Sequence, residues 1–342
     1  MLKRFSFLFL FVYLTLLSCG SSDESDILDI QEIETSKTYD WIVSKNDLTG
    51  SDDPFPFAEN PTVSSVNTVT GLKDSDIVVV VGFKNEVRAY PYKFISPYEV
   101  VNDQIENIKY AVKYCPVTES GVVVENIFQN ETSSFIASGF RYKQNLISLD
   151  NNSKTYWSQM LLKCVKGTYE NEYHKTLPMV ELSWKLTKQF FPNAKVFTST
   201  SISNKPQNSA RKNNDDIGID ERVFGNINLD EVNGTSVNIY RKSDFNTPIS
   251  LFEVIFNESK TITIGSSDLD FIVSFNVEIG SSFTPIQNEF PNVMIDETGS
   301  KWNVFGIATN GSRKSEQLQA TKSYKASWWA WKSFYNQFVF VE

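Results

Sequence analysis

Residues 114–121 read Tyr114-Cys115-Pro116-Val117-Thr118-Glu119-Ser120-Gly121 and bring together a thiol, a rigid proline, two hydroxyls, a carboxylate and a glycine. Apolar, strand-like runs flank this segment, from Ile108 to Lys113 before it and from Val122 to Val124 after it. Polar residues between two such runs are typical of a turn that connects two strands. We therefore expect a turn with reactive side chains, supported by a β-sheet.

The composition favours a large β-rich core. Of the 342 residues, 41% are hydrophobic and 14% are aromatic. This amount suffices for one large or two smaller domains, and aromatic residues favour half-buried pleated surfaces. We predict a β-rich α+β fold. The net charge of −9 argues against binding to nucleic acid, which requires a basic surface, and against electrostatic docking on anionic lipid.

The N-terminus has the pattern of a bacterial lipoprotein signal. Lys3 and Arg4 precede an apolar run from Phe5 to Leu17, which suits a signal peptide and is short for a membrane span. The following Leu-Ser-Cys resembles a lipobox, in which the thiol of Cys19 receives the lipid. We predict that residues 1–19 are a signal peptide and that Cys19 anchors the protein to a lipid bilayer. The alternative is an ordinary cleaved signal with an incidental cysteine.

Residues 20–50 are predicted to form a flexible acidic tether and the segment that leads into the folded part. Small and acidic residues dominate positions 20–26, where few apolar side chains are available for a core. This acidic run resembles the surface-export signal of lipoproteins of the Bacteroidota, and the alternative is a plain spacer. We predict a location at the outer membrane, on either its periplasmic or its cell-surface side.

The cysteines leave three possibilities. With Cys19 lipidated, Cys115 and Cys164 could form a disulfide, be two buried thiols, or include one reactive thiol. A zinc site made of Cys and His is disfavoured because His174 is the only histidine. We expect His174, which lies between polar residues, to be solvated. No metal site and no cofactor are identified.

Three segments carry clear structural patterns. The valine run from Ile77 to Phe83 predicts a buried strand, and residues 87–90 form its return strand after a hairpin turn. Polar residues between positions 96 and 103 suggest a loop or an edge strand. Apolar residues at helical spacing predict a helix over residues 182–191, ended by Pro192.

An internal repeat is visible in the order of large residues. Five residues recur at nearly constant offset: Asp150, Trp157, Gly167, Trp184 and Phe190 correspond to Asp296, Trp302, Gly311, Trp328 and Phe334. We predict a first repeat at 51–200, a linker at 201–219 and a second repeat at 220–342. Each repeat would hold several strands followed by one amphipathic helix, and the two would pack as one body.

Polar residues found only in the first repeat are the better candidates for function, because shared residues are most simply scaffold. We predict one pocket there, lined by Arg88, Tyr90, Glu99, Asn102, Asp103, Cys115, Glu119, Ser120, Asn145 and Gln159. An arginine with carboxylates and amides can bind a polar ligand through charge-assisted hydrogen bonds. The same groups could instead form a structural network that holds a loop.

Two kinds of catalysis are compatible with this set. Glu99 and Asp103 could divide acid and base roles if their environments differ. Cys115 could act as a nucleophile if a nearby base or cation favoured its thiolate, while a small buried residue is the alternative. No catalytic residue is assigned.

Several ordered motifs carry a family resemblance: Val-Arg-Ala-Tyr-Pro at 87–91, Glu-Val-Val-Asn-Asp at 99–103, Tyr-Cys-Pro at 114–116, Ser-Gly at 120–121 and 138–139, Asn-Leu at 145–146 and Trp-Ser-Gln at 157–159. Together they resemble the bacterial and archaeal domain of unknown function 3179 family, whose name implies no activity. The chain departs from the family pattern at Tyr98, where members often carry histidine. It also departs at Thr118, where many carry a second cysteine. The resemblance therefore implies neither a redox dithiol nor a two-cysteine metal site here.

Three functions are compatible with the sequence. The first is a lipoprotein that binds a small polar molecule or glycan in the predicted pocket. The second is an enzyme that uses Cys115 or the Glu99 and Asp103 carboxylates in that pocket. The third is a structural protein of the bacterial envelope.

Overall fold

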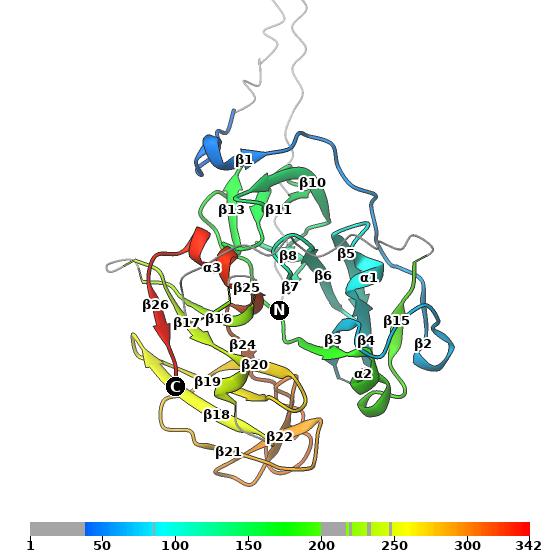
Figure 1. Ribbon diagram of the computed structural model, residues 1–342, viewed down its shortest axis with the longest axis vertical. Coiled ribbons are helices and arrows are strands. Elements are labelled where there is room, and N and C mark those ends of the chain that lie inside the picture. The colour runs from blue at the N-terminus through cyan, green and yellow to red at the C-terminus, as the bar shows by residue number, and fades with distance from the viewer. Residues whose placement is uncertain (1–37, 85, 200–216, 219–220, 231–233, 246–247) are drawn as a thin grey trace, which may run out of the picture. The chain divides into compact units, whose positions relative to one another are not determined.

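The computed structural model describes residues 38–84, 86–199, 217–218, 221–230, 234–245 and 248–342 (Figure 1). The predicted signal peptide at 1–19 and most of the predicted linker at 201–219 lie outside the described residues. Residues from Tyr39 to Glu342 form one compact unit. Among the described residues, no helix has the length and apolar character needed to cross a membrane.

Strands account for 47% of the residues and helices for 10%, which confirms the prediction of a β-rich α+β fold. Short 3-10 helices lie at Lys45–Asp47, Val66–Thr68 and Lys242–Asp244.

The predicted valine strand lies in the middle of a five-stranded sheet. This sheet has the order β14-β3-β4-β15-β2, with bounds Val180–Ser183, Ile77–Phe83, Glu86–Pro91, Lys195–Phe197 and Val63–Ser65. Helix α2 (Trp184–Phe190) follows β14, and its N-cap Ser183 accepts a hydrogen bond from the amide of Leu186. The predicted helix therefore starts later than expected, because residues 180–183 pair with β3 instead.

The turn at residues 114–121 connects two strands, as predicted. Strands β5 (Val100–Ile105), β6 (Ile108–Cys115) and β7 (Ser120–Glu125) form an antiparallel sheet in sequence order. Helix α1 (Tyr92–Ile95) precedes β5. Residues 100–103, expected in a loop or an edge, belong to the edge strand β5 and are buried.

The first half holds two further sheets. A five-stranded sheet has the order β1-β10-β11-β12-β13, with bounds Leu48–Thr49, Phe135–Tyr142, Asn145–Asp150, Tyr156–Ser158 and Lys163–Lys166. A two-stranded ribbon pairs β8 (Ile127–Phe128) with β9 (Glu131–Thr132).

The second half holds three sheets. The first has the order β25-β16-β17-β26, with bounds Ser323–Ser327, Arg222–Asn228, Ser236–Tyr240 and Phe338–Phe340. The second has the order β18-β19-β20-β24, with bounds Ser250–Phe256, Ser259–Ser266, Phe271–Val277 and Gln319–Ala320. The third has the order β21-β22-β23, with bounds Phe283–Pro285, Asn292–Asp296 and Lys301–Asn303. Helix α3 spans Trp328–Phe334.

Two of these sheets are connected in the same order. In the first half, the β3–β4 hairpin is followed later in the chain by β14 antiparallel to β3, by α2, and by β15 parallel to β4. In the second half, the β16–β17 hairpin is followed by β25 antiparallel to β16, by α3, and by β26 parallel to β17.

The two halves share their hydrophobic cores. One cluster joins Phe135 and Trp157 of the first half to Val223 and Trp331 of the second. Another joins Val80, Leu182 and Trp184 to Ile262 and Trp302. Burial of a large apolar side chain stabilises a fold by roughly 1.5–3 kcal/mol. The shared clusters therefore hold the sheets of both halves against each other and fix the surfaces between them.

Candidate functional site

Two hydrogen bonds from residues of the second half hold the backbone of the turn at 114–121. The amide of Ser327 donates a hydrogen bond to the carbonyl oxygen of Thr118 at 3.0 Å. The guanidinium Nε of Arg222 donates to the carbonyl oxygen of Glu119 at 2.9 Å. The turn therefore lies where β7 meets β16 and β25.

A cleft of about 720 Å³ opens beside this turn. Tyr114, Pro116 and Glu119 form one part of its wall, and Arg222 and Lys325 of the second half form another. Among its described lining residues, carboxylates and cations are equal in number: Asp76, Glu119, Glu181, Glu221 and Asp270 against Lys73, Lys93, Arg222, Lys242 and Lys325. We name this space the mixed-charge cleft. Its volume lies in the range of about 300–1,000 Å³ that is usual for small-molecule sites.

A pair of tyrosines forms an aromatic part of the cleft wall. The rings of Tyr92 and Tyr114 stack with centroids 3.9 Å apart and an interplanar angle of 12°. Gly121 leaves room for this pair, because a Cβ atom at that position would collide with the hydroxyl of Tyr92. The glycine at the end of the turn is thus required by close packing.

An ion pair lies next to these rings. Tyr92 donates its hydroxyl hydrogen to Oε1 of Glu181, and Nη2 of Arg222 donates to the same oxygen at 2.8 Å. Burial acts to lower the pKa of Arg222, but the negative charge of Glu181 outweighs it and the pKa is raised. Burial, aided by Glu181, raises the pKa of Tyr92 well above its usual range. At neutral pH the arginine is therefore a fixed cation and the tyrosine a neutral donor.

The guanidinium of Arg222 has hydrogen-bond donors that no described residue uses. Its Nε and Nη2 groups are committed to Glu119 and Glu181, whereas Nη1 donates to none of the described residues. The side chain is 21% exposed and lines the mixed-charge cleft. A guanidinium with a free edge in a partly buried pocket is well suited to an anionic group.

The opposite charges on the far wall are neutralised locally. Nζ of Lys325 donates to the backbone oxygen and to Oδ1 of Asp270, at 3.1 and 3.2 Å. Lys242 lies 3.3 Å from Oδ2 of the same carboxylate. Burial acts to raise the pKa of Asp270, but the two lysines outweigh it and lower the pKa.

Arg88, Tyr90 and Asp103, predicted to line a pocket, lie together but away from the mixed-charge cleft. Arg88 pairs with Asp103, and its Nε donates to Glu86 at 2.7 Å. The hydroxyl of Tyr90 donates to Asp103 at 2.6 Å and lies 2.6 Å from that of Tyr110. This network joins β4 to β5 and β6. Its geometry agrees with the structural alternative for these residues, and their role in binding stays a prediction.

Both polar atoms of the Asn102 side chain form hydrogen bonds with neighbouring residues. Its Nδ2 donates to the carbonyl oxygens of Ala58 at 3.0 Å and Phe135 at 2.7 Å. Its Oδ1 accepts from Asn126 and from the amide of Phe135. Asn102 therefore links β5 to β10 and to the segment that enters the folded part.

Ser120, Asn145 and Gln159, three further predicted residues, meet behind the turn. Nδ2 of Asn145 donates to Thr118 Oγ1 at 2.9 Å and to Gln159 Oε1 at 3.0 Å. Nε2 of Gln159 donates to the carbonyl oxygens of Lys113 and Ser120 at 3.2 and 3.0 Å. All of these side chains are buried. They fix the turn from the inside and do not line the cleft.

The environment of Cys115 keeps its thiol protonated. Cys115 is fully buried, and its Sγ lies 3.8 Å from the carbonyl oxygen of Gln144. Burial, with the charge of Glu99, raises its pKa. Glu99 is buried before β5 and adopts a left-handed conformation with φ of 56°. A thiol needs a lowered pKa to react readily, so this position offers little support for a nucleophile.

Cys164 resembles Cys115 in its surroundings. It is buried, and burial raises its pKa to about 12. Both cysteines are free. Of the three possibilities for this pair, the structure contains two buried thiols.

The expectation that His174 is solvated is wrong. The side chain is 4% exposed, and its ring stacks on Trp157 with centroids 4.2 Å apart. Its Nε2 lies 2.9 Å from Nζ of Lys113. Polar sequence neighbours gave no sign of this position, because a tryptophan distant in the sequence covers the ring.

Lys113 is a buried base that was not identified beforehand. It is fully buried, donates to Ser148 Oγ at 2.8 Å and lies 3.7 Å from the ring centroid of Phe135. Burial lowers the pKa of Lys113 well below its usual range, and burial together with Lys113 does the same for His174. The available signal was strand alternation, which sets Lys113 on the same face as the core residues Ala111 and Cys115.

The fold and the site together define a β-rich α+β protein with a polar, mixed-charge cleft walled by both halves of the chain. Within the described part of the chain, no group of three or more His, Cys, Asp and Glu side chains is arranged to hold a metal ion. Residues 52–338 match the family described as "Protein of unknown function (DUF3179)", and the chain belongs to this family. No curated protein and no solved structure matches the chain.

Proposed function

We propose that this chain is a lipid-anchored protein of the bacterial envelope that binds a small polar molecule or glycan unit in the mixed-charge cleft. The observation that carries the proposal is the free edge of Arg222 inside a cleft of about 720 Å³. A buried cation with unused donors is costly unless a partner or water completes its hydrogen bonds. An anionic group on the ligand would complete them.

The remaining lining suggests which ligand fits. Glu119 and Glu221 place negative charge in the same cleft as Arg222. A ligand with both signs of charge, such as an amino acid or an amino sugar acid, would pair with both sets. The stacked rings of Tyr92 and Tyr114 would give an apolar contact for its carbon skeleton.

In this proposal the turn at 114–121 forms one wall of the site, as the sequence suggested, with Glu119 facing the ligand. Ser120, Asn145 and Gln159 would hold the turn in place from behind. The enzyme alternative through Cys115 has less support, because its buried thiol is protonated at neutral pH. The binding experiment below distinguishes the proposed ligand-binding function from the alternative of a purely structural protein.

Ligand-induced thermal stabilisation tests the proposal. A panel of amino acids, dipeptides, amino sugars and sugar acids is screened against the full chain in detergent. A true ligand at about 100 times its Kd stabilises the fold by about 2.7 kcal/mol. Arg222→Gln is expected to remove this shift, because it removes the anion-binding edge. Arg313→Gln, an arginine outside the cleft, is the matched control and keeps the shift.

Two outcomes would contradict binding in this cleft. If no compound of the panel shifts the melting temperature, a structural role is favoured. If a shift persists unchanged in Arg222→Gln, the ligand binds elsewhere.

The lipid anchor is tested separately. The motif around Cys19 supports it, although these residues lie outside the described part of the chain. Cells grown with labelled palmitate should yield a labelled protein in the outer-membrane fraction. Cys19→Ser should abolish both the label and the membrane association, and a labelled Cys19→Ser protein would contradict the anchor.

We also infer that the two halves are pseudo-repeats. The common order of hairpin, returning strand, helix and parallel strand supports this inference. An experimental structure in which Trp157 and Trp302 fail to coincide when the β3–β4 and β16–β17 hairpins are overlaid would count against it.

A further inference from the structure

A second pocket, of about 550 Å³, lies on the other part of β16 and shares no lining residue with the mixed-charge cleft. Asn226 and Asn228 of β16 form one wall, and Asn276 of β20 forms another. Tyr173, between β13 and β14, and Lys322, between β24 and β25, complete it. We name this space the amide pocket.

The chemistry of the amide pocket is unlike that of the cleft. No aspartate or glutamate is among its described lining residues, although the chain as a whole has a net charge of −9 and the lining Asn257 donates to Oδ2 of Asp230 at 3.1 Å. Side-chain amides dominate its polar surface, contributed by Asn226, Asn228, Asn257, Asn276 and Gln319. Its two cations are Lys175 and Lys322. The described lining is therefore neutral to positive, with many groups that both donate and accept hydrogen bonds.

Lys322 provides an uncompensated charge. Lys175 pairs with Glu125 at 3.1 Å, but Lys322 makes no ion pair and no side-chain hydrogen bond with any described residue. Its Nζ lies 5.8 Å from the ring centroid of Tyr173. The side chain is half-buried, and burial lowers its pKa. A partly desolvated ammonium without a counterion favours the approach of an anion.

Asn228 gives an independent indication of a ligand. It is 9% exposed, yet its side-chain amide makes no hydrogen bond with the described residues. Two further amides are weakly used, since Asn226 donates to Ser274 and Asn276 to the carbonyl oxygen of Ala320, both at 3.4 Å. Buried polar groups usually have good partners, so these amides are available to a molecule in the pocket.

Strand alternation explains how β16 presents these groups. Val223 and Ile227 belong to the hydrophobic core, so the alternate residues Asn226 and Asn228 lie on the other face. Arg222 lies on that same face and lines the mixed-charge cleft. One face of a single strand thus contributes polar groups to two separate pockets.

We propose that the amide pocket binds an acidic sugar, with its carboxylate at Lys322 and its hydroxyls at Asn226, Asn228 and Asn276. Sugar hydroxyls both donate and accept hydrogen bonds, as side-chain amides do. The ammonium of Lys322 selects a sugar that carries a negative charge. The volume of about 550 Å³ accommodates one or two sugar units. This site is additional to the proposed function and does not depend on the mixed-charge cleft.

Titration calorimetry on the full chain in detergent tests the proposal with four probes: D-glucuronic acid, D-glucose, acetate and inorganic phosphate. Glucuronate is expected to bind at least about tenfold more tightly than glucose, acetate or phosphate. A tenfold difference corresponds to about 1.4 kcal/mol. Its affinity is expected to fall as salt is added, because the contact with Lys322 is partly exposed.

Three variants locate the binding. Lys322→Met should weaken glucuronate at least about tenfold and leave glucose unchanged, because only the charge contact is lost. Asn228→Asp keeps the shape of the side chain and adds a repelling carboxylate, so it should also weaken glucuronate. Lys314→Met, an exposed lysine outside the pocket, is the matched control and should bind as the parent protein does.

The results that overturn the proposal are distinct. Acetate or phosphate binding as tightly as glucuronate would indicate a simple anion site. Equal affinities for glucose and glucuronate would show that Lys322 does not contribute to recognition of the sugar. Glucuronate binding that survives both Lys322→Met and Asn228→Asp would place the sugar elsewhere, and absence of glucuronate binding to the folded parent protein would refute the site.

Discussion

Trp157 and Trp302 each follow a turn with similar hydrogen bonds, but the basic side chains beside the two turns differ in their surroundings. Asp150 Oδ1 accepts the amide of Asn152 at 3.1 Å, and Asp296 Oδ1 accepts the amide of Thr298 at 2.9 Å. In each turn two hydroxyl groups also lie within hydrogen-bonding distance of each other. Ser153 and Thr155 are 2.7 Å apart in the first turn, and Thr298 and Ser300 are 2.9 Å apart in the second. Trp157 donates to Thr155, whereas Trp302 donates directly to Asp296.

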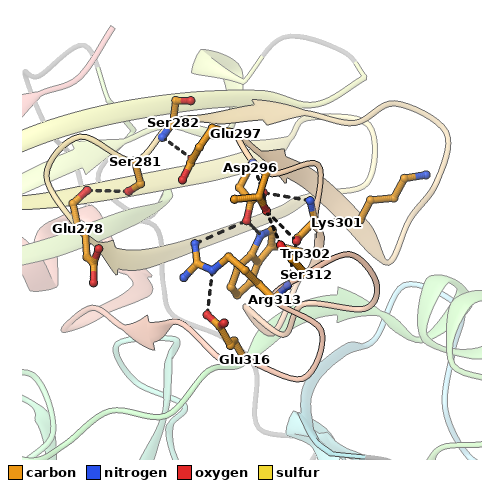
Figure 2. Close-up of polar contacts among 12 residues, drawn as sticks. Glu278, Ser281, Ser282, Asp296, Glu297, Lys301, Trp302, Ser312, Arg313 and Glu316 are labelled. Carbon is orange, nitrogen blue, oxygen red and sulfur yellow. Dashed lines mark hydrogen bonds and ion pairs between the residues drawn. The ribbon is translucent and has the colours of Figure 1, made fainter.

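The two tryptophan faces have different partners. Trp157 is covered by His174, which contacts the buried Lys113. Trp302 is covered by the guanidinium of Arg313, 4.7 Å from the ring centroid (Figure 2). Arg313 pairs with Asp296 at 3.5 Å and with Glu316 at 2.8 Å.

The difference shows how burial changes the pKa of a basic side chain beside a similar turn. Burial acts to lower the pKa of Arg313, but Glu316 and Asp296 outweigh it, so its pKa is raised and the charge is stable. Lys113 has no such compensation strong enough to overcome burial, and its pKa falls well below the usual value. One region therefore holds a permanent ion pair, and the other holds two bases whose charged forms are disfavoured by burial.

The largest expected effect is the loss of either tryptophan. Trp157→Ala and Trp302→Ala should each destabilise the fold by about 3–5 kcal/mol, because both rings are fully buried and their removal leaves a cavity. Urea unfolding followed by circular dichroism measures this. A cost below about 1 kcal/mol for one of them would count against the proposed equivalence of the two regions.

A second effect separates the regions by pH. The folded-state pKa of Lys113 lies below its unfolded value of 10.5, so the unfolded chain binds more protons and stability rises with pH up to that value. The slope contributed by one such group approaches about 1.4 kcal/mol per pH unit. In Lys113→Met this rise on the approach to the unfolded pKa of 10.5 should disappear from urea unfolding curves.

Lys109→Met is the matched control, since Lys109 is on the same strand but partly exposed, and it should keep the slope. The same sign applies to His174 below its ordinary value of 6.5, so acidification should destabilise the parent protein more than His174→Phe. An unchanged slope in Lys113→Met would mean that the lysine is charged in the folded state.

The smallest effect is expected at Arg313. Arg313→Ala removes a partly exposed cation–π contact and ion pair, which should cost about 0.5–1 kcal/mol and diminish with added salt. Urea unfolding at low and high salt measures it. A cost above about 2 kcal/mol would show that the guanidinium contributes more to stability than a partly exposed cation–π contact and ion pair do.

Local patterns predicted the elements well and the site only in part. The valine run of β3 and the turn after β6 follow from alternation and turn chemistry within a few residues. Tyr114 and Glu119 line the cleft and lie in the turn that the sequence singled out. Arg222 and Lys325 were not predicted, because both belong to the second half and only the fold brings them beside the turn at 114–121.

The environment of a side chain was harder to predict than its secondary structure. His174 lies among polar neighbours in sequence, and only the fold brings Trp157 over its ring. Arg88 and Asp103 lie together, but pairing across β4 and β5 uses their charges internally. Contacts between strands far apart in sequence decide these outcomes, and a local pattern carries no information about them.

The two buried thiols have a consequence for the reversibility of unfolding. In the native state Cys115 and Cys164 are both covered and protonated, so oxidants reach them slowly. Once the chain unfolds, both become accessible and can join in a disulfide that the native fold does not contain. Refolding yields after heating should therefore be higher with a reducing agent than in air. Under oxidising conditions the lifetime of the folded chain, more than its equilibrium stability, then determines how long the thiols stay reduced.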